Sequence, residues 1–325
     1  MKAKFINTVH LEGLLYEHSL ALKVSGPTSK APGTEFITGT IKIATDAQML
    51  NIVEVHYTYV TEKTKTGTSA TFTNLKSIID KNVMTYMEFK GKENYVPAYV
   101  RVDTAIGLND FYTDRNGQEE LVSAKRNEGG FLHFIRENEL APDMSRRNCF
   151  EADMVVTSIA RVEANEENEI PERMRVKGVV FDFRRGILPV EFVIYNPQGM
   201  ELFENQNPSA NSPFCTKVNG TVVSQTVMVR REEESAFGPA LVKEYPRSRK
   251  EYEIVSIFNQ VSYPWDDESF ITADELRKAM GDRETYLATV KKNNDEWKAQ
   301  RAANSAQPSA QAQATVQAKT GGFNF

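Results

Sequence analysis

The sequence predicts a mainly β protein with two antiparallel barrels in tandem, a C-terminal helix and a disordered tail. Short runs of alternating apolar and polar residues fill most of the chain before residue 265, and such alternation is typical of half-buried strands. An acidic stretch at residues 164–173, nearly free of large apolar side chains, interrupts these runs, and helical periodicity begins only after Ile271. We therefore expect four parts: a first barrel over residues 1–163, a second over residues 174–262, a helical extension over residues 263–302 and a tail over residues 303–325.

The first barrel is expected to contain four clear strand runs and one short helix. The runs are TEFITGTIKIAT (34–45), NIVEVHYTYV (51–60), AYVRVDTAIG (98–107) and FEADMVVTSIARVEA (150–164). Leu75, Ile78 and Ile79 have helical spacing. Turns containing Gly, Asn and Pro separate the runs, as an antiparallel barrel or sandwich requires.

The second barrel is expected to contain four further runs, at residues 174–184, 188–196, 215–230 and 251–259. We expect loops at residues 204–213 and 232–249, because their prolines are unsuited to a helix or a central strand.

A faint internal echo joins the two halves. Gly39-Thr-Ile is followed by Val53-Glu-Val, and Gly178-Val-Val is followed by Val190-Glu-Phe, at similar separations. Strand-rich segments also look alike by chance, so duplication and coincidence both stay open.

The C-terminal region has two different characters. Residues 272–303 read as a helix, in which Thr272 and Glu275 form a capping box. After Ala303 the chain is rich in Ala, Gln and Ser and contains no Asp or Glu. Such a segment buries too little apolar surface to offset its chain entropy, so we expect it to be disordered.

The composition indicates a soluble globular protein, with 40% hydrophobic and 26% charged residues and a net charge of −5. No apolar run approaches the roughly 18 residues of a membrane helix, and the first ten residues lack the apolar segment of a secretory signal. We expect a cytoplasmic protein without a membrane partner, in the bacterial host cytoplasm if a phage encodes it. Cys149 and Cys215 are expected to be free thiols.

No catalytic or metal-binding motif stands out. The four histidines are scattered and have no metal-ligand spacing with the cysteines, and phosphate-binding glycine loops and a nucleophile elbow are missing. We expect no enzymatic activity, no cofactor and no metal.

The opening of the chain resembles the single-stranded DNA-binding protein (SSB) family. Members begin with a strand of the type N-x-V-x-L-x-G-x-L, and this chain has Asn7-Thr8-Val9-His10-Leu11-Glu12-Gly13-Leu14-Leu15. A turn-rich stretch, two strands and a short helix follow in the family order over residues 25–80. By the same resemblance, the runs at residues 98–107 and 150–164 would close the first barrel. The resemblance implies OB-fold barrels, here in a two-barrel, phage-type version. It also implies a protein that coats and protects single-stranded DNA in replication, recombination and repair, without strong sequence specificity.

The resemblance extends to partners. A disordered tail that ends in Phe is a family trait, so Phe323 and Phe325 are expected to contact replication or recombination proteins. The tip of the family's tail is acidic, whereas this tail is not. Assembly into a homo-oligomer is left open.

Sequence-independent binding of single strands combines cations for phosphates with aromatic rings that stack on bases. Residues of these two kinds that we expect to bind nucleic acid are Lys42, Tyr57, Tyr59, Lys63, Lys65, Tyr86, Phe89, Lys90, Tyr99, Arg101, Phe111, Tyr112, Lys125, Arg126, Phe183, Arg184 and Arg185. A strand aromatic is more often a core residue than a stacking platform, so the expectation concerns the set. The alternative function is that of a β-rich phage structural or assembly protein.

Overall fold

The computed structural model describes residues 5–27, 29–65, 67–94, 96–165, 170–184, 186–233, 237, 241–264 and 270–306. The chain divides into two compact units. The first unit comprises the residues up to 109 together with 124–281, and the second comprises residues 110–123 together with the chain from residue 282. Among the described helices, none is long and apolar enough to cross a membrane.

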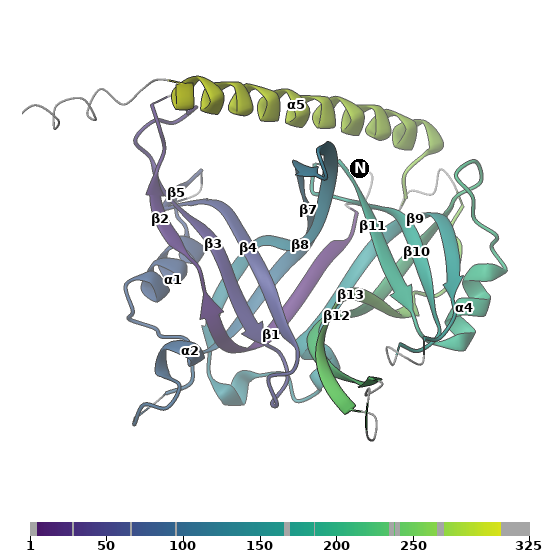
Figure 1. Ribbon diagram of the computed structural model, residues 1–325, viewed down its shortest axis with the longest axis horizontal. Helices are drawn as coiled ribbons and strands as arrows, with labels where there is room; N and C mark the ends of the chain where they lie inside the picture. The colour runs from purple at the N-terminus through teal and green to yellow at the C-terminus, as the bar shows by residue number, and fades with distance from the viewer. Residues whose placement is uncertain are drawn as a thin grey trace, which may run out of the picture. The chain divides into compact units, whose positions relative to one another are not determined.

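Five long strands make up the first set, drawn from purple to blue in Figure 1: β1 (Asn7–His18), β3 (Glu35–Ala44), β4 (Ile52–Thr61), β7 (Tyr99–Arg115) and β8 (Gln118–Ile135). β1 pairs with β3 and with β7, and β3 pairs with β4, all antiparallel. β8 neighbours β7 and pairs in parallel with β4. This is the connectivity of the five-stranded OB fold.

The second set has the same connectivity and comprises β9 (Asn148–Val162), β10 (Arg173–Phe181), β11 (Ile187–Ile194), β12 (Phe214–Glu233) and β13 (Leu241–Ile257). β9 pairs with β10 and with β12, β10 with β11, and β12 with β13, all antiparallel. β11 and β13 pair in parallel. The expected mainly β fold of tandem OB-like barrels with a C-terminal helix is therefore confirmed.

The two sets join through their first strands, and the register indicates an approximate two-fold relation. Asn7 and Asn148 are equivalent, since each side-chain amide bonds both backbone groups of one residue on the fourth strand, Ile106 and Val222 respectively. β1 and β9 are antiparallel, and Asn148 lies opposite Leu11 while Asn7 lies opposite Ala152. The sheet order β10-β11-β13-β12-β9-β1-β7-β8-β4-β3-β2 is symmetric about the β9–β1 pair apart from the added edge strand β2.

The internal echo in the sequence coincides with this relation. Gly39 and Gly178 both lie on second strands, and a side chain at either position would overlap a backbone carbonyl oxygen, of Ser19 or Val155. The Val-Glu-Val and Val-Glu-Phe triplets both lie on third strands. The similar triplets therefore occupy corresponding places in the two sets.

Each set is closed by a helix that follows its third strand. These helices are α1 (Ala70–Ile79) and α4 (Pro197–Glu204). α1 starts at Ser69, whose hydroxyl accepts from the Phe72 N–H, and buries Phe72, Leu75 and Ile78, so the helix expected there is confirmed. One apolar core runs through both sets, and a second cluster lies on the other face of β9–β12 beneath Phe270 and Ile271.

The other short elements are β2 (Ala21–Val24), β5 (Lys63–Thr64), β6 (Gly67–Thr68), α2 (Tyr86–Phe89), the 3-10 turn η1 (Glu137–Glu139) and α3 (Met144–Arg147). The long helix α5 (Ala273–Ala306) follows them. The capping box expected at the start of α5 is confirmed, because Thr272 and Glu275 exchange hydrogen bonds of 3.0 and 3.1 Å.

Two expectations differ from the structure. Residues 150–164 were expected to close the first barrel, but β9 pairs with β10 and β12 and is the first strand of the second set. The segment 232–249 was expected to be a loop, but residues 241–257 form β13, and Pro246 lies opposite Met228 in an antiparallel ribbon. The domain limits given above stay predictions, because both sets belong to one compact unit.

Candidate nucleic-acid interface

The outer face of strands two, three and five in the first set carries polar residues. Strand alternation turns Ile41, Val53 and Val55 into the core, so Lys42, His56 and their neighbours face outward. Arg126 on β8 donates to Glu128 at 2.6 Å, and Lys42 donates to Glu17 at 2.7 Å. This face is the one with which OB folds bind oligonucleotides.

Two outward-facing lysines, one from each set, each contact a residue of the other set. Lys250 on β13 reaches the Glu54 carboxylate on β4 at 3.4 Å, and Lys125 on β8 donates to the Glu191 carbonyl oxygen on β11 at 2.9 Å. The parallel register places Asn127 beside Val55, and Glu253 beside Val193. Glu54 and Glu191 are the middle residues of the two similar triplets, and counted from them this register makes Lys125 equivalent to Lys250. Lys250 contacts the Glu54 carboxylate of the first set, and Lys125 contacts the Glu191 carbonyl oxygen of the second set.

Between these contacts lies a cavity of 190 Å³ that we call the junction cavity. Its walls come from β4, β8, β12 and β13, and its lining residues are Val53, Glu54, His56, Lys125, Arg126, Asn127, Val222, Val223, Ser224, Lys250, Glu251 and Tyr252. The Tyr252 hydroxyl donates to Asn127 at 3.0 Å, and Asn127 donates to the Glu54 carbonyl oxygen at 2.9 Å. The cavity lining thus combines three valines and a tyrosine with three cationic side chains and two glutamates.

Burial shapes the charge of this region. It lowers the pKa of Lys125, whose ammonium group also lies 5.8 Å above the Tyr252 ring. Burial and the nearby Arg126 guanidinium lower the pKa of His56, which favours the neutral imidazole. Glu54 pairs with Lys250 and Glu128 pairs with Arg126, so each of these two cations already has a carboxylate partner.

The second set carries a corresponding charged face. Arg175 pairs with Glu191 at 2.6 Å, and Arg249 lies 4.6 Å from the Tyr195 ring centroid while donating to Glu251 at 2.9 Å. Arg249, Lys250, Arg175 and Tyr195 were missed by sequence reasoning. Arg249 was assigned to a loop, and Lys250 lay between that loop and the strand expected at residues 251–259. The signal that could have placed them is the run of basic residues before the EYEIVSIFN strand.

The turn between β10 and β11 displays an aromatic ring and a cation. The Asp182 carboxylate accepts from the backbone N–H groups of Arg184 and Gly186 at 2.7 and 2.8 Å, which fixes the turn. Phe183 is 87% exposed, and the Arg184 guanidinium lies 5.0 Å from its ring centroid. Such a ring is available for stacking. Arg185, the third predicted residue of this turn, lies outside the described residues.

Other predicted residues lie elsewhere. Tyr57 is a core residue, 2% exposed, so the expectation that it stacks on bases is corrected: the ring shares its strand face with Val53 and Val55. Tyr59 is half exposed and packs on Phe36. Five further members of the first half lie at two other places: Lys63 and Lys65 at the β5–β6 hairpin, and Tyr86, Phe89 and Lys90 at α2. Phe111 and Tyr112 belong to the second unit, and Phe323 and Phe325 lie outside the described residues.

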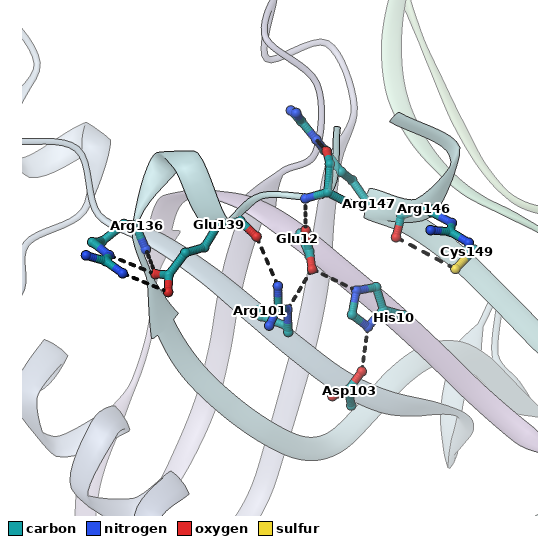
Figure 2. A network of polar contacts seen from close by, with 10 residues as sticks. His10, Glu12, Arg101, Asp103, Arg136, Glu139, Arg146, Arg147 and Cys149 are labelled. Atoms are coloured by element: carbon teal, nitrogen blue, oxygen red, sulfur yellow. Dashed lines mark hydrogen bonds and ion pairs between the residues drawn. The ribbon is translucent and has the colours of Figure 1, made fainter. Parts of the chain in front are cut away.

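Tyr99 and Arg101 lie on β7, and Arg101 belongs to a structural network shown in Figure 2. Its guanidinium donates to the buried Glu12 carboxylate at 2.6 Å, which also accepts from the Ala141 N–H at 2.6 Å and contacts His10 at 3.1 Å. Burial alone would raise the pKa of Glu12, but these donors hold it below its usual value. The network ties the segment between the two sets to β1 and β7.

Within the described residues, no group of three or more His, Cys, Asp or Glu side chains is arranged to hold a metal ion. The polar side chains of the outer faces make the ion pairs and hydrogen bonds described above.

Comparison with known proteins gives three results. A search of curated proteins finds no match. Two crystal structures of the single-stranded DNA binding protein from Thermus aquaticus are similar to this chain, one of the wild type and one of a deletion mutant. Each has a TM-score of 0.42 and 10% sequence identity; the wild type covers 82% of this chain and 98% of its own, and the mutant 81% and 99%. The YorF family model matches residues 6–293, and the protein therefore belongs to the YorF family.

Proposed function

We propose that this protein binds single-stranded DNA without strong sequence specificity, and that it coats and protects such strands in phage DNA replication, recombination and repair. The observation that carries the proposal is the meeting of two OB-type faces at the junction cavity, which Lys125, Arg126 and Lys250 line together with apolar side chains. Single-strand binding needs cations for the phosphates and apolar or aromatic surface for the bases.

The proposed path follows the outer faces of strands two, three and five and crosses the junction cavity. Phosphates would replace Glu54 on Lys250 and Glu128 on Arg126, because these carboxylates already hold the cations in place. The exposed Phe183 ring with its Arg184 neighbour supplies a stacking position on the second set. We further propose that the protein acts by binding alone and is not an enzyme.

The test is binding of fluorescent dT oligomers across a salt series. We expect binding that weakens as salt increases, since phosphate contacts release counterions. Lys250→Gln should weaken binding, whereas Lys76→Gln should not, because Lys76 lies on α1 in an exposed pair with Asp80. Absence of binding to long dT at low salt would overturn the proposal and favour the alternative of a structural or assembly protein.

A further inference from the structure

The second unit is held together by ion pairs between a β hairpin and a helix. The tip of the β7–β8 hairpin (residues 110–123) supplies Asp110, Asp114 and Glu119, and residues 282–306 of α5 supply Arg283, Lys291 and Lys298. We call this arrangement the clasp. Arg283, Lys291 and Lys298 are eight and seven residues apart, which is close to two helical turns each time. Their side chains therefore lie on one side of the helix.

The two ends of the clasp differ in strength. Arg283 makes two hydrogen bonds to Asp110, of 2.6 and 2.8 Å, with side chains that are 11% and 1% exposed. Ser123 also donates to Asp110 at 2.6 Å. Buried pairs of this kind are costly to separate, so this end anchors the helix to the hairpin.

The far end is more exposed than the anchor, although the Glu119 side chain is only 22% exposed. Lys298 contacts Glu119 at 2.9 Å and Asp114 at 3.2 Å, and the side chains of Lys298 and Asp114 are 38% and 63% exposed. Lys291 also pairs with Glu119, and its ammonium group lies 5.3 Å from the Tyr112 ring centroid. Exposed pairs contribute little stability and weaken in salt, so the far end can separate while the anchor stays in place.

We propose that the far end of the clasp is a second binding site for strand phosphates, in which Lys291 and Lys298 exchange the Glu119 and Asp114 carboxylates for the DNA backbone. The lysines lie on the order of 10 Å apart along the helix, and their exchange uncovers the Tyr112 ring for stacking beside the exposed Phe111. The hairpin carboxylates thus act as an internal competitor of the strand. This proposal rests on the proposed function.

The experiment compares two neighbouring glutamates. Glu119→Gln removes the carboxylate shared by both lysines, and Glu120→Gln removes the same charge next to it, from a residue whose ion pair is with Arg115 at 3.6 Å. We expect Glu119→Gln to tighten dT binding about two- to fivefold at low salt, the size of an exposed ion pair. Glu120→Gln should have a clearly smaller effect.

A mutant cycle tests whether the tighter dT binding of Glu119→Gln depends on Lys291 and Lys298. In a Lys291→Gln, Lys298→Gln background, Glu119→Gln should have no more effect than Glu120→Gln. Lys298→Gln alone should weaken binding, and circular dichroism melting checks that each variant folds. Equal effects of the two glutamate variants, with wild-type binding intact and weakened by Lys250→Gln, would show that the clasp is only structural. Loss of wild-type binding itself would overturn both proposals.

Discussion

Lys250 donates to the Glu54 carboxylate across 3.4 Å, although the two residues are 196 positions apart in the chain. Their equivalents, Lys125 and Glu191, also meet, through the Glu191 carbonyl oxygen. The Lys250 cation is thus already paired with a carboxylate from within the protein, and this pairing has a measurable consequence.

Glu54→Gln should tighten dT binding about two- to fivefold, because Lys250 then loses its competing partner. The slope of log affinity against log salt should steepen by up to about 0.7, the contribution of one more released counterion on single strands. Fluorescence titration across salt measures both. A weaker affinity of Glu54→Gln with unchanged folding would contradict the exchange.

Asn148→Ala should lower the free energy of unfolding by about 1–3 kcal/mol, because it leaves both backbone groups of the buried Val222 position without their side-chain partner. Urea unfolding measures the loss, with the exposed Asn109→Ala as the control. The equivalent Asn7→Ala should give a loss of similar size, and a negligible loss in both would contradict the role of these amides.

Glu12 should make stability depend on pH. Its pKa is lowered from 4.5 in the folded chain, so its contribution is complete above 4.5 and is lost as the pH falls through the lower folded value. Glu12→Gln should be less stable than the wild type at neutral pH by about 1–3 kcal/mol. The difference should shrink below pH 4.5 in urea unfolding, and a constant difference would count against an ionised Glu12.

Gly13→Ala should destabilise the first set by about 1–3 kcal/mol, since the added methyl group would overlap the Ala44 carbonyl oxygen on β3. Gly26→Ala is the matched control, because a side chain there meets no atom within 4 Å. Thermal melting compares the stability of the two variants. Equal stability would mean that β1 and β3 can separate locally without loss of stability.

Much of the fold was predictable because strand alternation is a local signal. The runs at residues 34–45 and 51–60, the helix near Leu75 and the capping box at Thr272 all follow from neighbouring residues. The assignment of β9 failed because alternation does not say which strand pairs with which. Here β9 pairs with β1 as well as with two strands of its own set.

The candidate site was less predictable, because it depends on contacts between distant parts of the chain. Lys125 and Arg126 were identified from composition, but Glu191, whose carbonyl oxygen accepts from Lys125, and Lys250, which lines the same cavity, lie in the other set. Tyr57 was chosen by residue type, and only the packing shows that its ring faces the core.

The two-fold relation between the sets also bears on strand direction. A DNA strand has a 5′ and a 3′ end, and a two-fold rotation reverses that direction. A strand that runs straight across the junction cavity would therefore meet the two OB faces with opposite polarity. Equivalent binding to both faces would require the strand to turn back on itself, whereas a straight path would require the faces to differ. The two faces do differ at the junction cavity, because Asn127 in the first set corresponds to Tyr252 in the second.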